Sequence, residues 1–515
     1  MENFGFLSII PPLITIVLAI KTKNVLVSLF AGVFFGVLVL ANWNPVVALA
    51  NLVKDYIYVQ ASEDSNAQSL TNFLIIGGFV TFIETTGGAS AFASKITKFV
   101  KNKRTAETAT FIGGLAIWFS DSANALICGP IFKPLTDSFK TSREKLAYIL
   151  DSTSTLDAAM IPIISWGVYI MGLIQKELDK FPQIEMSSWD VFVQAIPFQF
   201  YSILSLFMIG FVCITQFDFG PMLVAQKRAA EEGKLLRDGA VPLGGETIVE
   251  LREGVVPQAK TVVVPLLVMV CVTFAVFIAN GFPKVSMPGI VIRQGIALGF
   301  IIGAIVCAII SITQKILTPK ECEDAVLSGM KNMMSLIVLM IFSWSLGSVC
   351  TALGTAYYII EATQDFLNPA FLPVILFVIG TVMSFASGSS WGTFAVMIPI
   401  GFPMAITMGA PLLVTVASII GGGLVGDHFS PVSDTNILAS MAAGCDHMDH
   451  FRTQMPYALV AASVGAVLYI ISGFYQNAFI VIPGIAALYV IIYVLHKFSL
   501  NKINKTNKVQ TLNNI

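Results

Sequence analysis

Charge is scarce in this sequence. Of its 515 residues, only 12% are Asp, Glu, Lys or Arg, whereas a soluble globular chain carries about 25%. Because 56% of the residues are hydrophobic, the shortage of charge excludes an ordinary soluble protein and indicates one that lies in a lipid bilayer. The 30 basic residues are balanced by 31 acidic ones, which argues against a nucleic-acid partner.

The cysteines and the sequence motifs give no sign of redox, metal or enzyme chemistry. Seven cysteines lie mostly within apolar runs, with no close pair and no metal-ligand spacing: Cys128, Cys213, Cys271, Cys307, Cys322, Cys350 and Cys445. Such cysteines are typical of buried small hydrophobic residues, so we expect neither a disulfide framework nor a transition-metal site. No His-Glu-x-x-His, Gly-x-Ser-x-Gly or phosphate-binding glycine loop lies at a suitable depth, so the sequence does not predict an enzyme.

Apolar runs long enough to cross a bilayer fill most of the chain. A helix needs about 20 apolar residues to span the bilayer core. This length predicts about 11 spans, near residues 5–20, 24–42, 67–88, 145–175, 191–215, 261–280, 294–313, 332–360, 411–442, 455–475 and 477–495. We expect the first run to remain as a span rather than to be removed as a signal peptide, because no basic residue precedes it and it contains Pro11 and Pro12.

Two further apolar stretches are interrupted by small polar residues and predict re-entrant hairpins. Residues 105–135 are broken at 120–124, and residues 370–407 at 387–392. An arm of about 15 residues is about 22 Å long, short of an apolar core about 30 Å thick, so both tips should stop near the middle of the membrane. Basic residues flank only the first stretch, which should therefore enter from the cytoplasm. They include Lys95, Lys98, Lys133 and Arg143.

The positions of the basic residues predict an orientation and a repeat. Most of them fall on one side of this arrangement, which by the positive-inside rule is the cytoplasm, so the N-terminus is outside and the C-terminus inside. The order of elements in residues 1–215 recurs in 261–475 from the opposite side, as in transporters built from inverted-topology repeats. Residues 216–260 are then a cytoplasmic linker loop, 476–496 a final span and 497–515 a basic cytoplasmic tail. The predicted fold class is an all-α polytopic membrane protein.

Two of the predicted cytoplasmic segments allow more than one interpretation. Residues 221–239 form either a short amphipathic surface helix or a plain linker between the two halves. Residues 445–450 read Cys-Asp-His-Met-Asp-His, which looks like a metal-binding run. The same residues also suit pH sensing by His447 and His450, or an ordinary gate or capping loop before the next span.

Four interruptions, namely the two hairpin tips and two broken spans, point to one shared site. Irregular backbone persists at membrane depth only where it is buried in protein or lines a cavity. The broken spans carry acidic and hydroxyl residues at 151–157 and 426–436, and a carboxylate at this depth costs at least about 2.5 kcal/mol. For coupling to an ion or a proton the candidates are Asp121, Asp157, Asp434, Asp151 and Asp427. Asp151 and Asp427 could instead cap half-helices.

Uncharged polar residues at the same interruptions are candidate ligands for a cation or a substrate. Hydroxyl and carbonyl oxygens are hard ligands that suit a small cation such as sodium. The candidates are Ser122, Asn124, Thr153, Ser154, Ser387, Ser389, Ser390, Ser433, Thr435 and Asn436. Small polar residues also favour a tight turn for its own sake. Glu84 lies near the end of its span, where it is either part of the site or solvated.

Two segments resemble a known transporter family. Residues 426–459, GDHFSPVSDTNILASMAAGCDHMDHFRTQMPYAL, resemble the signature of the NhaC-type sodium/proton antiporter family. Residues 118–166, WFSDSANALICGPIFKPLTDSFKTSREKLAYILDSTSTLDAAMIPIISW, are similar to the first-half region of its longer members. The resemblance implies an ion transporter with paired re-entrant hairpins, many of whose relatives are homodimers that move as elevators. It also implies sodium at Asp121, Asp157, Asp434 and Thr435, beside Ser433 and Asn436, with no other cofactor.

Two functions stay open at this point. In sodium/proton antiport, the two cations compete for the same carboxylates during alternating access, and the lack of intramembrane Lys or Arg suits this exchange. In sodium-coupled transport, a small amino acid or organic acid would bind at the hairpin tips beside the ion, which the uncharged tip residues suit. The resemblance favours antiport, and the expected location is the cytoplasmic membrane of a bacterium.

Overall fold

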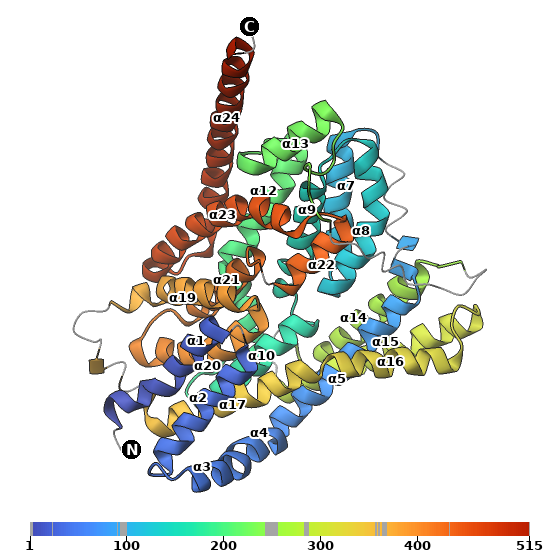
Figure 1. Ribbon diagram of the computed structural model, residues 1–515. Coiled ribbons are helices and arrows are strands. Elements are labelled where there is room, and N and C mark those ends of the chain that lie inside the picture. The colour runs from blue at the N-terminus through green and yellow to red at the C-terminus, as the bar shows by residue number, and fades with distance from the viewer. Residues whose placement is uncertain are drawn as a thin grey trace.

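Helices account for every long element of the described chain. The computed structural model describes residues 4–22, 24–89, 91–92, 100–242, 256–282, 288–355, 358, 361–362, 368–431 and 433–513. Within these residues the one pairing of extended backbone is an isolated bridge between Pro242 and Asp446. Figure 1 shows the helical body, with the two termini at opposite ends. The predicted all-α polytopic fold class is confirmed.

The number of candidate spans agrees with the sequence prediction, but the members differ. Among the described residues, 9 helices are long and apolar enough to cross a membrane, or up to 11 if each of two bent pairs counts as one span. This number includes both arms of the second predicted hairpin, Pro369–Ser387 and Ser390–Met408. The predicted spans at 5–20 and 411–442 contain only shorter apolar helices.

The first half of the chain ends at a long apolar helix. Its helices are α1 (Ile10–Thr22), α2 (Val25–Leu40), α3 (Pro45–Asn51), α4 (Tyr58–Ser62), α5 (Asp64–Thr85), α7 (Lys103–Ala116), α8 (Asp121–Ser138), α9 (Arg143–Thr155), α10 (Ser165–Leu178), α11 (Ser188–Ala195) and α12 (Phe200–Thr215). Shorter segments are η1 (Gly5–Ile9), η2 (Leu52–Ile57), η4 (Ala158–Met160) and η5 (Ile196–Phe198). After α2 the chain bends by 116°, because Asn42 and Trp43 adopt left-handed backbone conformations and Asn44 caps α3.

The second half begins after the linker and ends in one continuous helix. Its helices are α14 (Lys260–Ala279), α15 (Gly289–Thr313), α16 (Pro319–Asn332), α17 (Met334–Leu353), α19 (Leu372–Ser387), α20 (Ser390–Met408), α21 (Leu412–His428), α22 (Asp434–Ala443), α23 (His447–Tyr475) and α24 (Val481–Asn513). Shorter segments are η6 (Pro369–Phe371) and η7 (Ala478–Ile480). Both predicted hairpins are helix pairs, α7 with α8 and α19 with α20, although the depth of their tips in a membrane stays a prediction.

Corresponding elements of the two halves make corresponding contacts. The first hairpin packs against α9, and its α8 also packs against α22 from the other half. The second hairpin packs against α21, and its α20 also packs against α10 from the other half. In the same way α2 contacts α17, and α15 contacts α5. This reciprocal pattern is what an inverted repeat would produce, and the division at 1–215 and 261–475 stays a prediction.

The linker between the halves contains a docked helix, α13 (Gly220–Glu232), and so is not a plain linker. Arg228 donates to both carboxylate oxygens of Glu144 on α9 at 2.9 and 3.0 Å. Arg237, beyond the helix, pairs with Asp449 on α23 at 3.0 Å, and the main-chain N–H of Val241 donates to Asp446 at 2.8 Å. Residues 243–255, together with Lys95 and Lys98 of the first hairpin's predicted flank, lie outside the described residues.

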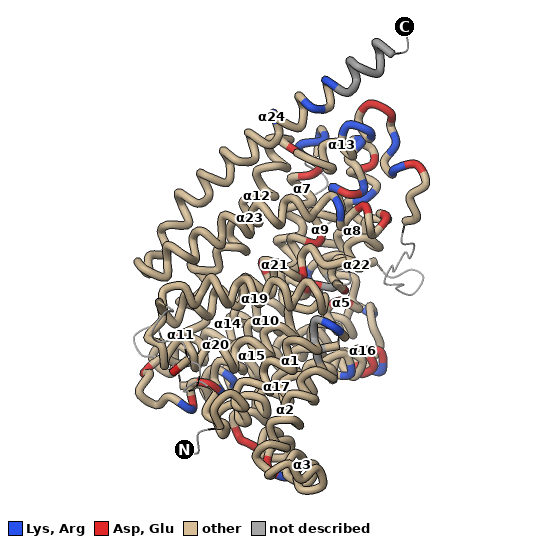
Figure 2. The backbone as a smooth tube through the Cα atoms, turned by 60° about the vertical axis from the view of Figure 1, so that its left-hand side comes forward, with Lys and Arg blue, Asp and Glu red and all other residues tan. Residues whose placement is uncertain are grey.

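Many of the charged residues lie around α13. Figure 2 shows blue and red segments gathered around α13 and the neighbouring ends of α7, α8 and α9, whereas the tube through α19, α20 and α21 is largely tan. A buried ion pair lies near this charged end, where Lys145 of α9 contacts Asp218 at 2.5 Å and Tyr457 donates to the same carboxylate oxygen at 2.9 Å. We call this the α13 end, and it corresponds to the predicted cytoplasmic side.

Close packing between α19 and α21 brings the second hairpin against the broken span. A Cβ atom at Gly422 would lie 2.4 Å from the carbonyl oxygen of Phe377, and one at Gly426 would lie 2.3 Å from that of Thr381. Glycine is therefore required for the two backbones to approach, as in other small-residue helix interfaces in membranes. The approach allows Ser384 of α19 to donate to the carbonyl of Gly423 at 2.5 Å.

Candidate functional site

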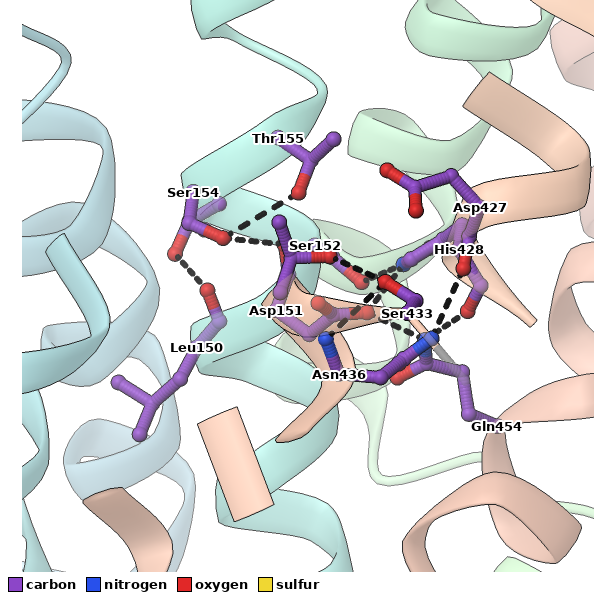
Figure 3. Close-up of polar contacts among 12 residues, drawn as sticks. Leu150, Asp151, Ser152, Ser154, Thr155, Asp427, His428, Ser433, Asn436 and Gln454 are labelled. Carbon is purple, nitrogen blue, oxygen red and sulfur yellow. Dashed lines mark hydrogen bonds and ion pairs between the residues drawn. The ribbon is translucent and has the colours of Figure 1, made fainter. Parts of the chain in front are cut away.

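The two broken spans meet where α9 and α21 end. Asp151 of α9 lies 3.4 Å from Nε2 of His428, the last residue of α21. The same nitrogen is 2.8 Å from the hydroxyl of Ser152, and Nδ1 is 2.6 Å from the hydroxyl of Tyr201 on α12. All four side chains are buried. Figure 3 shows Asp151, Ser152 and His428 converging from the two half-helices.

Gln454 of α23 links the two broken spans. Its amide nitrogen donates to Asp151 at 2.5 Å, to the side-chain oxygen of Asn436 at 3.1 Å, and to the main-chain carbonyl of His428. Asn436 in turn donates to the carbonyls of Asp427 and Ser430 at 2.8 and 3.1 Å. The carbonyl of Asp427 lies in the last turn of α21 and that of Ser430 lies just beyond it, so no continuing helix bonds either of them. Two amide side chains therefore stabilise the break, as Figure 3 shows for Asn436 and Gln454.

Asp427 accepts a hydrogen bond from the second hairpin. The hydroxyl of Ser390, at the start of α20, donates to one oxygen of Asp427 at 2.9 Å and to the carbonyl of Gly423 at 3.1 Å. The other carboxylate oxygen of Asp427 is buried without a hydrogen-bond partner among the described residues, and the same is true of one oxygen each of Asp151 and Asp157. Three buried carboxylate oxygens are therefore open to a cation or a proton.

The first hairpin contributes Asn124 and Asp121. Asn124 donates to the carbonyls of Gly114 on α7 and Thr153 on α9 at 2.8 and 3.0 Å, so it ties the hairpin tip to the end of the first broken span. Asp121, the first residue of α8, accepts from the indole N–H of Trp166 at 3.2 Å. Asp121 is also close enough to Asp157 and Asp434 for their charges to interact.

Aromatic side chains line the side of the first tip. The rings of Trp166 on α10 and Trp391 on α20 have centroids 4.6 Å apart, and Phe394 lies edge-on to Trp166 at 6.1 Å. Tyr169 donates to the main-chain oxygen of Trp391 at 2.8 Å. The hairpin of one half is thus joined to the broken span of the other by an aromatic contact beside Asp121.

Exposure differs among the five carboxylates selected from the sequence. Asp151, Asp427 and Asp157 are 0%, 2% and 7% exposed, whereas Asp121 is half-buried and Asp434 is exposed. Neither Asp151 nor Asp427 starts a helix, so neither is an N-cap. Asp157 does cap η4, through the N–H of Ala158 at 2.7 Å. Among the described residues, no Lys or Arg forms an ion pair with Asp151, Asp157, Asp427 or Asp434.

Several of the predicted hydroxyl ligands make hydrogen bonds within their own helices or at helix ends instead of lying close to one another. Ser154 bonds to the carbonyl of Asp151, and Ser387 to that of Met383, each within its own helix. Ser389 caps α20 by accepting from Gly392. Ser433 caps α22 and contacts Thr435 at 2.9 Å. The side chain of Ser122 lies outside the described residues. Their role as ligands stays a prediction.

Four residues of the site were not selected from the sequence: His428, Gln454, Tyr201 and Trp166. His428 adjoins Asp427 within the break, so its position was a usable signal. Gln454 and Tyr201 lie in regular helices and carry no local signal. Glu84, left open above, is close enough to Asp121 for their charges to interact. Across the described residues, no group of three or more His, Cys, Asp or Glu side chains is arranged to hold a metal ion.

Relatives of this chain are transporters or proteins of undescribed function. A protein of Haemophilus influenzae, described only as uncharacterized, is 32% identical over 509 residues, which is 95% of both chains. A Bacillus subtilis protein described as a malate-2H(+)/Na(+)-lactate antiporter is 28% identical over 159 residues, 30% of this chain and 33% of that one. The YdaH transporter structure from Alcanivorax borkumensis superposes with a TM-score of 0.51 at 13% identity, covering 82% of this chain and 87% of that one.

The YdaH similarity supports the fold alone, since the sequence identity is low. The family relation is carried by a family model described as the Na+/H+ antiporter family, which matches residues 4–164 and 158–474. These two matches cover both hairpins, both broken spans and all five selected carboxylates. The chain therefore belongs to the Na+/H+ antiporter family.

Proposed function

We propose that this protein exchanges sodium for protons across the membrane by alternating access. The observation that carries the proposal is the set of three buried carboxylates, Asp151, Asp157 and Asp427, each with one unpartnered oxygen and no Lys or Arg partner among the described residues. An uncompensated carboxylate at membrane depth costs at least about 2.5 kcal/mol. Each must therefore hold a proton or face a bound cation, and exchange of one for the other is the function of an antiporter.

The groups around these carboxylates suit sodium. Carboxylate, amide and main-chain carbonyl oxygens are hard ligands, and the ends of broken helices supply carbonyls in other sodium-coupled transporters. Asp434 and Asp121 are the more exposed carboxylates and would meet an arriving ion first. From there the ion would pass to the buried carboxylates of Asp151, Asp157 and Asp427. We keep Asp121, Asp157, Asp434 and Thr435 as the proposed sodium ligands.

The packing suggests which parts move. Both hairpins and both broken spans contact one another across the two halves, so they would move as a unit around the bound ion. The helices α1, α2, α5, α14 and α15, which pack mainly among themselves and with α16 and α17, would form the scaffold. An elevator movement of the first group against the second is our proposal, in a bacterial cytoplasmic membrane with the α13 end inside.

A second function is supported by the aromatic contact at the first hairpin tip. Trp166 and Trp391 present apolar faces next to Asp121, which is a suitable environment for an organic solute as well as an ion. The N-termini of α8, α20 and α22 also lie at the breaks, and helix N-termini bind carboxylates. The Bacillus subtilis relative is described as an antiporter of malate and lactate. Sodium-coupled transport of a small amino acid or organic acid is therefore the alternative.

Sodium flux into sealed vesicles that contain the purified protein tests both functions. Internal pH is recorded at the same time, and amino acids and organic acids are added in turn. Sodium entry that drives proton exit without an organic solute supports antiport, whereas sodium entry that needs one solute supports the alternative. Asp434→Asn should abolish sodium-driven flux, and Asp55→Asn, at an exposed carboxylate paired only with Lys54 in the described structure, is the matched control. Undiminished flux in the Asp434 variant would refute its assignment.

A further inference from the structure

Two histidines at the start of α23 face one hydroxyl. Nδ1 of His447 is 3.1 Å from the Oγ of Ser440 on α22, and Nδ1 of His450 is 2.8 Å from the same atom. Ser440 and His450 are completely buried, and His447 is half-buried at the α13 end. Ser440 also donates to the main-chain oxygen of Asn436, one turn earlier, at 2.7 Å. We call these three residues the His–Ser–His cluster.

The opposite nitrogen of each ring must carry a hydrogen. Nε2 of His447 is 2.8 Å from the main-chain carbonyl of Pro431, which can only accept. Nε2 of His450 is 2.7 Å from the side-chain oxygen of Gln454. The orientation of the Gln454 amide is set by its other end, because its nitrogen faces three oxygens, including the carboxylate of Asp151. Both rings are therefore N–H donors at Nε2.

Counting hydrogens shows that the cluster is one proton short when both rings are neutral. A neutral imidazole carries a single N–H, so both Nδ1 atoms would be acceptors. The carbonyl of Asn436 already accepts the helical N–H of Ser440 within α22, but the one hydroxyl hydrogen of Ser440 would have to serve two ring acceptors, His447 and His450. A proton added to either ring turns one of these contacts into a donor to the serine oxygen, which has lone pairs to accept it. One Nδ1 atom would be left without a hydrogen, and an unpaired acceptor costs about 1–3 kcal/mol when it is buried, which favours the added proton.

We propose that His447 and His450 together bind one proton, shared through Ser440, and that this proton controls the carboxylate of Asp151. The link is Gln454, which accepts from His450 at one end and donates to Asp151 at the other, at 2.7 and 2.5 Å. A protonated ring is the stronger donor, and it polarises the amide so that the bond to Asp151 strengthens as well. Loading the cluster therefore stabilises the ionised, cation-binding form of Asp151.

The charged groups around the cluster allow it to hold a proton. Arg237 from the linker pairs with Asp449, Arg228 of α13 pairs with Glu144 of α9, and Arg143 of α9 pairs with Asp137. Lys133 of α8 lies near Gly444, at the end of α22. Unlike these three paired acids, Asp446, next to His447, forms no ion pair with a Lys or Arg among the described residues. Burial raises the pKa of Asp446, but hydrogen bonds from the N–H groups of Val241, Asp449 and Met448 outweigh it and lower the pKa overall. Asp446 therefore keeps its negative charge next to the cluster.

The placement of the cluster fits a sensor of the solution at the α13 end. His447 is half-buried there and can exchange protons with that solution, whereas His450 and Gln454 are completely buried behind it. Histidine is the side chain that changes charge between about pH 5 and 8. The cluster would thus report cytoplasmic acidity to the site where sodium and protons compete. This last step rests on the proposed function, while the shared proton does not.

Histidine NMR on the full-length protein in lipid nanodiscs tests the shared proton directly. The chain has 4 histidines, so each ring can be assigned from one His→Gln variant. We expect the rings of His447 and His450 to shift together between about pH 5 and 8 and to take up one proton in total. In Ser440→Ala the midpoint should fall by about one pH unit or more, because the shared hydrogen bond is lost. Rings that stay neutral, or that titrate independently and unchanged in Ser440→Ala, would overturn the proposal.

Sodium-driven flux as a function of pH at the α13 side tests the control of Asp151. In the parent protein we expect flux to rise as the α13 side is acidified, because the loaded cluster stabilises the ionised form of Asp151. His447→Gln keeps a donor for the carbonyl of Pro431 but cannot bind the proton, so this rise should disappear. His496→Gln is the matched control, since His496 is also half-buried near the same end and, among the polar groups that the structure describes, contacts only the carbonyl of Asp218. A normal pH profile in His447→Gln refutes control by the cluster, even if NMR confirms the proton. Absence of sodium flux in the parent protein refutes the proposed function alone.

Discussion

Replacing Gln454 with methionine removes the amide that links both broken spans while keeping a side chain of similar length. In the structure this amide bonds to Asp151, Asn436, His450 and the carbonyl of His428, all of them buried. The bond to the carboxylate is charge-assisted and contributes about 1.5–3 kcal/mol. Without it the ionised form of Asp151 loses that stabilisation, and a proton replaces the cation there.

The expected result is a loss of sodium affinity at neutral pH. Since 1.4 kcal/mol corresponds to a factor of ten, the sodium concentration for half-maximal transport should rise about 10- to 100-fold. Raising the pH should recover part of this loss, because fewer protons then compete. The assay is radioactive sodium uptake into proteoliposomes at several pH values, with the amount of inserted protein measured by immunoblot.

A matched control separates this effect from general damage to the core. The side chain of Gln199 is also completely buried but makes a single long hydrogen bond within the described part of the chain, from its amide to the carbonyl of Ala159 at 3.4 Å. Gln199→Met should therefore change the sodium dependence by less than about twofold, because no charged group loses a partner. Sodium affinity that is unchanged in Gln454→Met, or lowered equally in both variants, would refute the reasoning.

Two further predictions concern stability. Lys145→Met leaves the buried carboxylate of Asp218 without its cation and should destabilise the protein by about 3–5 kcal/mol. The double variant Lys145→Met with Asp218→Leu should recover most of that loss. Thermal unfolding in detergent measures both variants. Gly422→Ala introduces a Cβ at 2.4 Å from the carbonyl oxygen of Phe377, so it should separate α19 from α21 and lower the unfolding temperature. The control is Gly220→Ala, which has open space around its Cβ position but a φ of +57°. This control shows the cost of the strained backbone conformation alone. An unfolding temperature in Gly422→Ala at or above that of the Gly220 variant would contradict the packing argument.

The broken spans and hairpins were accessible from the sequence because their signal is local. Small polar residues within an apolar run identify an interruption wherever they occur, and 120–124, 151–157, 387–392 and 426–436 all proved to be breaks or helix ends. The outcome for the predicted span at 24–42 was less complete, since α2 leads into a bend that depends on the left-handed conformations of Asn42 and Trp43. The local sequence does not predict that conformation, because residues other than glycine adopt it only rarely.

The partners at the site could not be predicted, because they depend on packing between distant elements. Ser152 and His428 are 276 residues apart, and Gln454 and Asp151 are 303 apart. Their helices could rotate or slide without changing the sequence pattern. A hydroxyl is equally ambiguous, since Ser390 reaches Asp427 whereas Ser387 bonds to a carbonyl of its own helix. Composition alone does not decide between those two outcomes.

The docked linker affects how movement of this protein can be observed. Because Arg228 holds α9 and Arg237 holds α23, the segment from α13 to Val241 is fixed to two different helices. A spectroscopic label on Asp238, whose side chain is 81% exposed, would therefore follow those helices instead of reporting the fluctuations of a free loop. The same anchoring makes this segment a handle from which an antibody fragment or a chemical crosslink could hold the transporter in one conformation.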